Sequence, residues 1–387
     1  MRFYASGCDS SQCNSVRYGV HTAKIHDKSW VSFEYNLNPS CILSCFSIAF
    51  VKLNSIYLKY LYLVVIVWLI SCEDSNQDKV EEKAVVPKDT IEKEVFPALG
   101  HDAPYITDST YFGRNNYIEY IAGNIPIILS APHGGALTPD EIPDRTYGTT
   151  VTDANTYQLT KVIMDSMVIR YGGRPHVILC RLKRTKLDAN RDSIEAAQNN
   201  RFALRAFNEF HFYIDQAKKK IERDFGSGLF FDMHGHGANP DGFYDLRTWL
   251  GYLIKGDELD LSNDELKNNV DPNMSSIRAL IDSSEFEFVE LLRGSSSFGT
   301  MLTDLGFSCV PSSDHLGPEG SRFFSGGYNT LVHGSKNGGM ISAIQIEAPK
   351  PGIRENTATW SKFASAFTST VSKFYKMHLR RDIITID

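Results

Sequence analysis

Apolar runs and helical patterns alternate along the chain from about residue 97 to its end. Short runs of buried-strand or alternating character cover 116–121, 125–129, 176–182, 229–232, 250–254 and 340–346. Patterns of helical period cover 153–171, 194–225 and 357–379. This alternation predicts an α/β fold with a mixed, largely parallel central sheet flanked by helices. Ligands of such sheets bind at the carboxyl ends of the strands.

Two of the helical patterns have features that bear on function. The last helix carries an aromatic stripe that includes Trp360, Phe363 and Phe367, which we interpret as core packing and not as a cofactor site. Asp153 stands at the start of the first helical pattern, where an N-cap or first-turn residue belongs. The stretch 255–297 lacks the alternation and is rich in Asp, Asn and Ser, so we expect an insertion or lid within a single catalytic domain that covers 97–387.

The first 72 residues differ in kind from the rest, since they hold five of the seven cysteines. An uncharged run from Tyr60 to Ser71 follows Lys52 and Lys59 and ends at Cys72. This resembles a bacterial lipoprotein signal peptide over 54–72, with Cys72 as the lipidated residue. We therefore expect 1–53 to be an extension before the true start, 73–96 to be a polar tether, and the protein to be anchored in the cell envelope. A membrane anchor or a buried apolar helix is the alternative.

Composition narrows the choice of partners. The chain has 387 residues, 42% of them hydrophobic, and a net charge of −6, which is typical of a globular protein. Its lysines and arginines are dispersed and form no basic stripe, so we do not expect nucleic acid as a partner.

Histidines follow two of the predicted strands. Asp232-Met233-His234-Gly235-His236 comes after the apolar run Leu229–Phe231, and Ser130-Ala131-Pro132-His133-Gly134-Gly135 comes after the run 125–129. A catalytic zinc ion takes about three N or O ligands from the protein, so His133 and His234 are candidates for two of them. The alternative for each histidine is a plain hydrogen bond to a neighbouring loop.

Two further polar groups end apolar runs. Arg184, Asp188, Asn190 and Arg191 stand within eight residues, a composition that suits recognition of a carboxylate, although a surface salt-bridge turn would look the same. Glu347 closes the strand 340–346 and is a candidate general base, with a solvated or ion-paired carboxylate as the alternative.

Taken in order, these motifs resemble the N-formylglutamate amidohydrolase family, from about Ile125 to Arg354. That family has a Pro-His-Ser/Gly-Gly strand end, an Arg…Asp-x-Asn-Arg segment, an Asp-x-His strand end and a Gln-x-Glu near the C-terminus, and is distantly similar to the zinc carboxypeptidases. The resemblance implies roles for seven residues: metal ligands His133, Asp153 and His234, carboxylate-binding Asn190 and Arg191, a polarising Arg184, and the general base Glu347. Glu141 is the second choice for the acidic ligand. His236 is a candidate partner behind the ligands or a proton donor, not a ligand itself, and His315 and His333 receive no role.

The resulting hypothesis is an enzyme that uses Zn²⁺ or another divalent metal to hydrolyse a linear amide C–N bond. Its substrate would be a small N-acyl amino acid or peptide-like molecule with a carboxylate. The alternatives are a cell-surface lipoprotein that binds an anionic ligand without turnover, and a zinc carboxypeptidase or peptidoglycan-fragment hydrolase.

Overall fold

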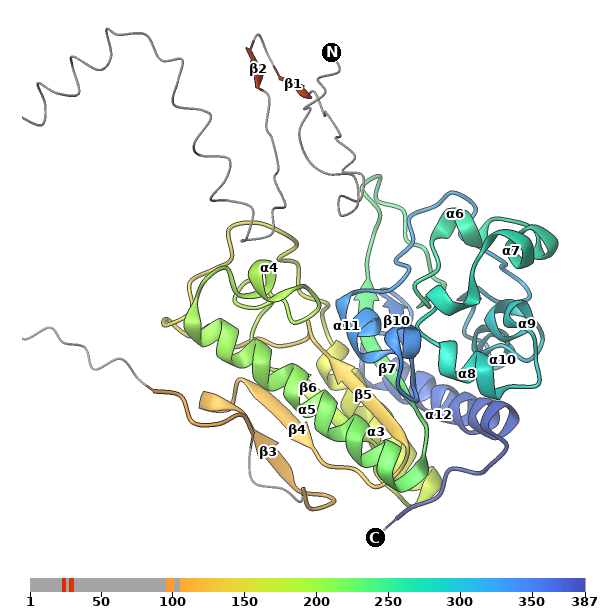
Figure 1. The fold of residues 1–387 in the computed structure, drawn as a ribbon, viewed down its shortest axis with the longest axis horizontal. Coiled ribbons are helices and arrows are strands. Elements are labelled where there is room, and N and C mark those ends of the chain that lie inside the picture. Colours follow the sequence, from red (N-terminus) through yellow and green to blue (C-terminus); the bar gives the residue numbers. More distant parts are fainter. Residues whose placement is uncertain (1–22, 26–27, 31–94, 101–104, 387) are drawn as a thin grey trace, which may run out of the picture. The chain divides into compact units, whose positions relative to one another are not determined.

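A computed structural model describes residues 23–25, 28–30, 95–100 and 105–386 (Figure 1). The chain forms two units, Met1–Lys93 and Glu94–Asp387. In the first, β1 (Ala23–Ile25) and β2 (Lys28–Trp30) pair antiparallel. The predicted signal peptide 54–72 lies outside the described residues, as do most of the predicted extension and tether. Among the helices that the structure does describe, none is both long and apolar enough to cross a bilayer.

The second unit is built on one eight-stranded sheet. Its strands, in spatial order, are β3 (Thr110–Phe112), β4 (Ile118–Ile121), β6 (His176–Cys180), β5 (Ile127–Ala131), β7 (Gly228–His236), β10 (Ile341–Pro349), β8 (Thr248–Gly251) and β9 (Cys309–Val310). The four central strands β6, β5, β7 and β10 run parallel, whereas β4 and β8 flank them in the antiparallel sense. The predicted mixed, largely parallel sheet is confirmed.

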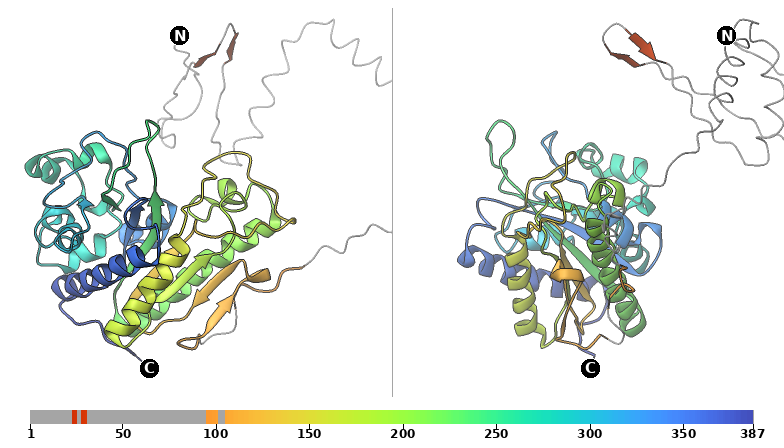
Figure 2. Two further views of the ribbon diagram at one scale, coloured as in Figure 1. Left: turned by 180° about the vertical axis from the view of Figure 1, so that it is seen from behind. Right: turned by 90° about the vertical axis from the view of Figure 1, so that its left-hand side faces the viewer.

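Three long helices cover the sheet. The helices α3 (Thr156–Tyr171) and α12 (Thr357–Leu379) pack against each other on one face, and α5 (Arg201–Phe225) covers the other (Figure 2). The shorter helices are α4 (Ser193–Ala197), α6 (Gly256–Leu259), α7 (Asn263–Asn269), α8 (Arg278–Ser283), α9 (Phe288–Arg293), α10 (Phe298–Thr303) and α11 (Tyr328–His333), with 3₁₀ turns η3 (Arg114–Asn116), η4 (Pro272–Met274) and η5 (Ser335–Asn337).

Strand alternation decides which side chains can reach a site. Along β7, Leu229, Phe231 and Met233 belong to the core under α3 and α12, and Phe230 belongs to the core under α5. Because successive side chains point to opposite faces, Asp232 and His234 continue the α5 face beyond Phe230. The same face is therefore apolar in the middle of the sheet and polar at its carboxyl edge.

The structure departs from the sequence-based elements in several places. The helix predicted over 194–225 is interrupted where Gln198 and Asn199 take positive φ values of 45° and 63°, and Asn200 then caps α5 by accepting hydrogen bonds from two backbone N–H groups. Asp153 does not cap α3, which begins at Thr156, because its carboxylate is used elsewhere. The short strands β3 and β9 were not predicted.

The stretch 255–297 folds into the short helices α6 to α9 and the turn η4. Apolar residues of this stretch, including Leu259, Leu266, Leu280 and Leu291, are buried in the same cluster as the α3 and α12 face of the sheet. The segment is thus a packed part of the core, and its movement as a lid remains a prediction.

His176 makes the fold sensitive to acid. It is fully buried in β6, its Nδ1 lies 2.8 Å from the Tyr120 hydroxyl, and burial lowers its pKa to about 3. The pKa of a histidine in an unfolded chain is about 6.5, so between pH 3 and pH 6.5 the unfolded state binds more protons than the folded state. The stability that is present above pH 6.5 is therefore lost as the pH falls toward 3. We expect a loss of about 1 kcal/mol per pH unit from this residue below pH 6.

Urea unfolding at pH 7 and pH 4.5 measures this loss. The His176→Asn variant retains an acceptor for Tyr120 without the titrating ring, so its free energy of unfolding should depend less on pH than that of the wild type. Equal pH dependence in the two proteins would show that His176 is not the acid-sensitive group.

Candidate active site

Three predicted ligands converge at the carboxyl edge of the sheet. His133 stands two residues after β5, His234 lies in β7, and Asp153 comes from the loop before α3. The Nδ1 atoms of His133 and His234 lie 3.4 and 3.2 Å from Oδ2 of Asp153, and one potential ligand atom from each residue lies within 4.8 Å of the others. All three side chains are buried. This group could hold a metal ion.

Glu141, the second choice for the acidic ligand, is engaged elsewhere. Its carboxylate pairs with the Arg114 guanidinium at 2.5 Å and accepts a hydrogen bond from the Tyr117 hydroxyl at 2.6 Å. Asp153, and not Glu141, therefore shares a site with the two histidines.

A second carboxylate supports each imidazole. His133 Nε2 lies 2.6 Å from Oδ1 of Asp188, and His234 Nε2 lies 2.7 Å from Oδ2 of Asp232. When Nε2 carries the hydrogen for these bonds, the lone pair of each Nδ1 faces Asp153. Carboxylates that orient imidazoles in this way are frequent behind metal-binding histidines.

Sequence analysis did not identify Asp188 or Asp232 as a carboxylate behind a histidine. The period-2 alternation of β7 places Asp232 on the same face as His234, so that signal was available. Asp188 lies in a loop, where no such periodicity applies.

The charges in the cluster balance each other. Burial raises the pKa of Asp153, but hydrogen bonds and attraction to His133 and His234 outweigh it and hold that pKa well below its usual range. Burial lowers the pKa of His234, but Asp232 and Asp153 outweigh it and raise that pKa to about 10. A divalent cation would replace the proton that the neighbouring carboxylates favour on His234.

Glu347 stands beside the cluster on the neighbouring strand. It is the register partner of His234 in the parallel β10–β7 pair, it is 4% exposed, and its Oε1 accepts a hydrogen bond of 3.0 Å from the Gln345 side chain. Burial, helped by the charge of Asp153, raises its pKa to about 7. A carboxylate with a pKa near the working pH is well matched to proton transfer.

Arg184 is held by carboxylates within the site. Its Nε donates to Oδ2 of Asp188 at 3.0 Å, and its Nη1 lies 3.5 Å from Oδ1 of Asp153. The guanidinium thus compensates the negative charge behind the ligands, and its predicted role in polarising a carbonyl remains a prediction.

Asn190 and Arg191 differ in how free they are. The Asn190 side chain is buried, accepts a hydrogen bond from the backbone N–H of Asn329 at 2.8 Å, and has its Nδ2 3.2 Å from His234 Nε2. The Arg191 side chain is 36% exposed, and its Nη1 donates to the Asn190 carbonyl at 2.7 Å. Arg191 therefore has more donor capacity available for a ligand than Asn190.

A cavity of about 530 Å³ joins these residues. The seven residues predicted for the site all line it: His133, Asp153, Arg184, Asn190, Arg191, His234 and Glu347. Sequence analysis missed Arg322, which also lines it and lies 4.7 Å over the Phe324 ring. The Gly-rich stretch that follows Phe324 marks the loop but does not indicate that an arginine faces the cavity.

His236 lines the cavity as a neutral acceptor. Its ring stacks on Trp249 with centroids 3.8 Å apart, and its Nε2 donates to the Arg247 carbonyl at 3.0 Å. Burial lowers its pKa to about 4, and its buried Nδ1 has no hydrogen-bond partner in the described part of the chain. A hydrogen-bond acceptor is thus the role that this geometry favours over the proton donor.

The other unassigned histidines do not line this cavity. His333 Nε2 lies 2.7 Å from Nδ1 of His211, in a pair that links α11 to α5. The backbone carbonyl of His315 accepts a hydrogen bond from Ser312.

Replacing Asp232 tests whether the carboxylates behind the histidines matter for metal binding. Besides His234, its partners are the neutral side chains of Ser130 and Asn329, so Asp232→Asn removes a charge without leaving another buried cation unpaired. We expect the affinity for zinc, measured by competition with a chromophoric chelator, to fall by about 10- to 100-fold. Asp224→Asn on α5 is the matched control, and equal affinities of wild type and Asp232→Asn would contradict this role.

Comparison with known proteins gave only distant structural likenesses. No protein-family model and no curated protein sequence matches the chain. The fold is similar to an N-formylglutamate amidohydrolase from Ralstonia eutropha JMP134, with 13% sequence identity over 67% of this chain and 96% of that one and a TM-score of 0.42. It is also similar to a gene product from Agrobacterium tumefaciens, with 10% identity over 67% of this chain and 95% of that one and a TM-score of 0.40. A third similar structure is the catalytic domain of an N-acetylmuramoyl-L-alanine amidase from Bacillus (Paenibacillus) polymyxa var. colistinus, with 9% identity over 65% of this chain and 98% of that one and a TM-score of 0.30. The first of these carries the family name that the motifs suggested, but likenesses this weak give no support to a function, which depends on the site itself.

Proposed function

We propose that this protein is a zinc-dependent hydrolase that cleaves a linear amide C–N bond in an N-acyl amino acid or peptide-like molecule with a carboxylate. One observation carries the proposal. The buried group His133, Asp153 and His234 lines the same cavity as Glu347, a carboxylate whose pKa is about 7.

The donor atoms fit zinc. Two imidazoles and one carboxylate form a common set for a catalytic zinc ion, which leaves a coordination position for water or substrate. Within the described part of the chain the buried Nδ1 of His133 makes no hydrogen bond and faces Oδ2 of Asp153 at 3.4 Å, as expected of an atom that could bind a metal ion. A zinc ion held there would polarise the amide carbonyl and make a water molecule more acidic. Another divalent metal would supply the same chemistry.

Glu347 moves the proton in this proposal. Its carboxylate takes a proton from the attacking water and passes it to the nitrogen of the leaving amine. Burial keeps its pKa close to neutral, so it can both accept and release a proton near pH 7. The hydrogen bond from Gln345 fixes the position of its Oε1.

Arg191 and Asn190 bind the substrate carboxylate in this proposal. The cavity places Arg191 and Arg322 on the same lining as the metal ligands, so an anionic group and the scissile amide can occupy it together. Arg184 holds Asp188 and Asp153 in place, and in this position it also adds positive charge where an oxyanion would form.

Metal content and turnover in three proteins test the proposal. We expect about one zinc ion per wild-type chain by elemental analysis, loss of the metal in His234→Ala, and retention in Glu347→Gln with turnover of N-acyl amino acids lowered by about 10² to 10⁴-fold. Asp224→Asn should match the wild type in both. Absence of metal from a folded wild type supplied with zinc would favour a binding protein without turnover, and full activity in Glu347→Gln would remove it as the base.

We also propose that the protein is held in the bacterial cell envelope through lipid on Cys72, on the basis of the signal-peptide pattern over 54–72. Cells that express the full chain and are fed radiolabelled palmitate should label the wild type and not Cys72→Ser. Cys180→Ser, which changes a buried thiol of the sheet, is the control that should stay labelled. Label retained in Cys72→Ser would refute attachment at that residue.

A further inference from the structure

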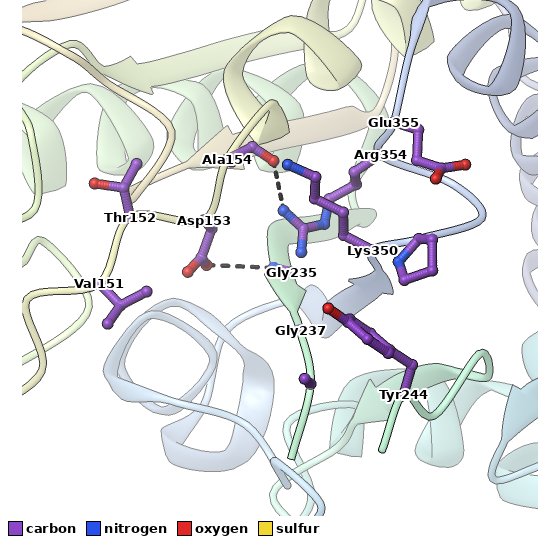
Figure 3. A pocket seen from close by; sticks show the side chains of 12 residues that line it. Val151, Thr152, Asp153, Ala154, Gly235, Gly237, Tyr244, Lys350, Arg354 and Glu355 are labelled. Atoms are coloured by element: carbon purple, nitrogen blue, oxygen red, sulfur yellow. Dashed lines mark hydrogen bonds between the residues drawn. The ribbon is translucent and has the colours of Figure 1, made fainter. Parts of the chain in front are cut away.

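A second cavity adjoins the proposed active site. It has a volume of about 540 Å³ and shares five lining residues with the first cavity: Val151, Asp153, Gly235, Gly237 and Ala238. Its remaining lining comes from Thr152 and Ala154 on either side of Asp153, from Tyr244 in the loop after β7, and from four residues of the stretch 350–355 after β10 (Figure 3). None of these lines the first cavity, where Arg191 and Arg322 lie. The predicted metal ligand Asp153 thus lines both cavities.

The two cations of this second cavity differ in availability. Arg354 is buried, and each of its three guanidinium nitrogens already donates to a backbone carbonyl, of Ala348, Ala154 or His236. Lys350 is exposed, and within the part of the chain that the structure describes its ammonium group has no ion pair and no side-chain hydrogen bond. Lys350 is therefore the cation that the cavity can offer to a ligand.

The other walls suit a chain that is apolar along its length. Tyr244, Val151 and Pro351 present apolar surface, and Figure 3 shows the Tyr244 ring beside Gly237 and the Lys350 side chain extending away from that ring toward Ala154. Neither acidic lining residue neutralises the charge of Lys350. The Asp153 carboxylate accepts a hydrogen bond from the Gly235 N–H and faces the histidines. Glu355 is exposed and makes no ion pair with Lys350.

We infer that this cavity binds the acyl part of the substrate, and that the preferred acyl group is several carbons long and ends in a carboxylate. The inference rests on the proposed function. If the amino-acid carboxylate lies at Arg191 in the first cavity and the scissile bond at the metal ligands, the acyl group on the other side of that bond extends past Asp153. A formyl group has a single carbon atom and would leave the second cavity empty. A carboxylate at the far end would meet Lys350.

A matched set of substrates tests the inference on the full-length, zinc-loaded protein. The substrates are the N-formyl, N-valeryl and N-glutaryl derivatives of L-glutamate, where valeryl and glutaryl have equal carbon number and differ in the terminal carboxylate. We expect kcat/KM for the glutaryl derivative to exceed that for the formyl derivative by at least about tenfold. In Lys350→Gln the ratio of glutaryl to valeryl kcat/KM should fall by about tenfold. Lys373→Gln, an exposed lysine of α12, should leave that ratio unchanged.

The outcomes separate this inference from the proposed function. Fastest hydrolysis of the formyl derivative, or an unchanged glutaryl to valeryl ratio in Lys350→Gln, would overturn the role of the second cavity while leaving the hydrolase intact. No turnover of any derivative by zinc-loaded protein would overturn the proposed function and this inference with it.

Discussion

The burial of five charged or chargeable groups at one edge of the sheet is the constraint on which the rest of the site depends. Asp153, Asp188, Asp232, His133 and His234 are all removed from water, which is costly for any ion that lacks a partner. Each carboxylate has one: Asp153 meets both imidazoles, Asp188 meets His133 and Arg184, and Asp232 meets His234.

This compensation reaches into the surrounding elements. Asn329 at the start of α11 donates its side-chain amide to Asp232 and its backbone N–H to Asn190, so one short helix ties a carboxylate of β7 to the loop after β6. Arg145 extends the network, with its Nη1 3.7 Å from Asp188. The positions of loops that carry no regular pattern are therefore set by the ionic cluster more than by local propensity.

Much of the fold could be predicted from the sequence, because strand and helix periodicities are local signals. His133, His234 and Glu347 follow or end apolar runs, and parallel strands bring such ends to one edge, so their convergence was also predictable. Asp153 was identified as a ligand through a family resemblance, but it was also predicted to cap the following helix. A residue just before a helix looks like a cap in the sequence even when its side chain points to another group, as the Asp153 carboxylate does to the histidines.

Contacts between distant loops left no such signal. Whether Arg322 faces the cavity, or Asp188 rather than Glu195 meets His133, depends on the path of irregular segments, for which no periodicity exists. The packed helices of 255–297 were missed for a related reason, since each is only four to seven residues long and shows less than two full turns of pattern.

The stretch after β10 shows how one segment serves both structure and binding. Arg354 donates to the His236 carbonyl and lies so close to Gly235 that a Cβ at that position would overlap its guanidinium. The absence of a side chain at Gly235 therefore lets Arg354 hold the end of β7, and with it His234, in register with β10. Lys350 begins the same segment, and its backbone N–H donates to the same His236 carbonyl at 3.1 Å. Because Arg354 fixes the backbone on which Lys350 stands, the Lys350 cation is held near the candidate metal ligands without taking part in their charge balance.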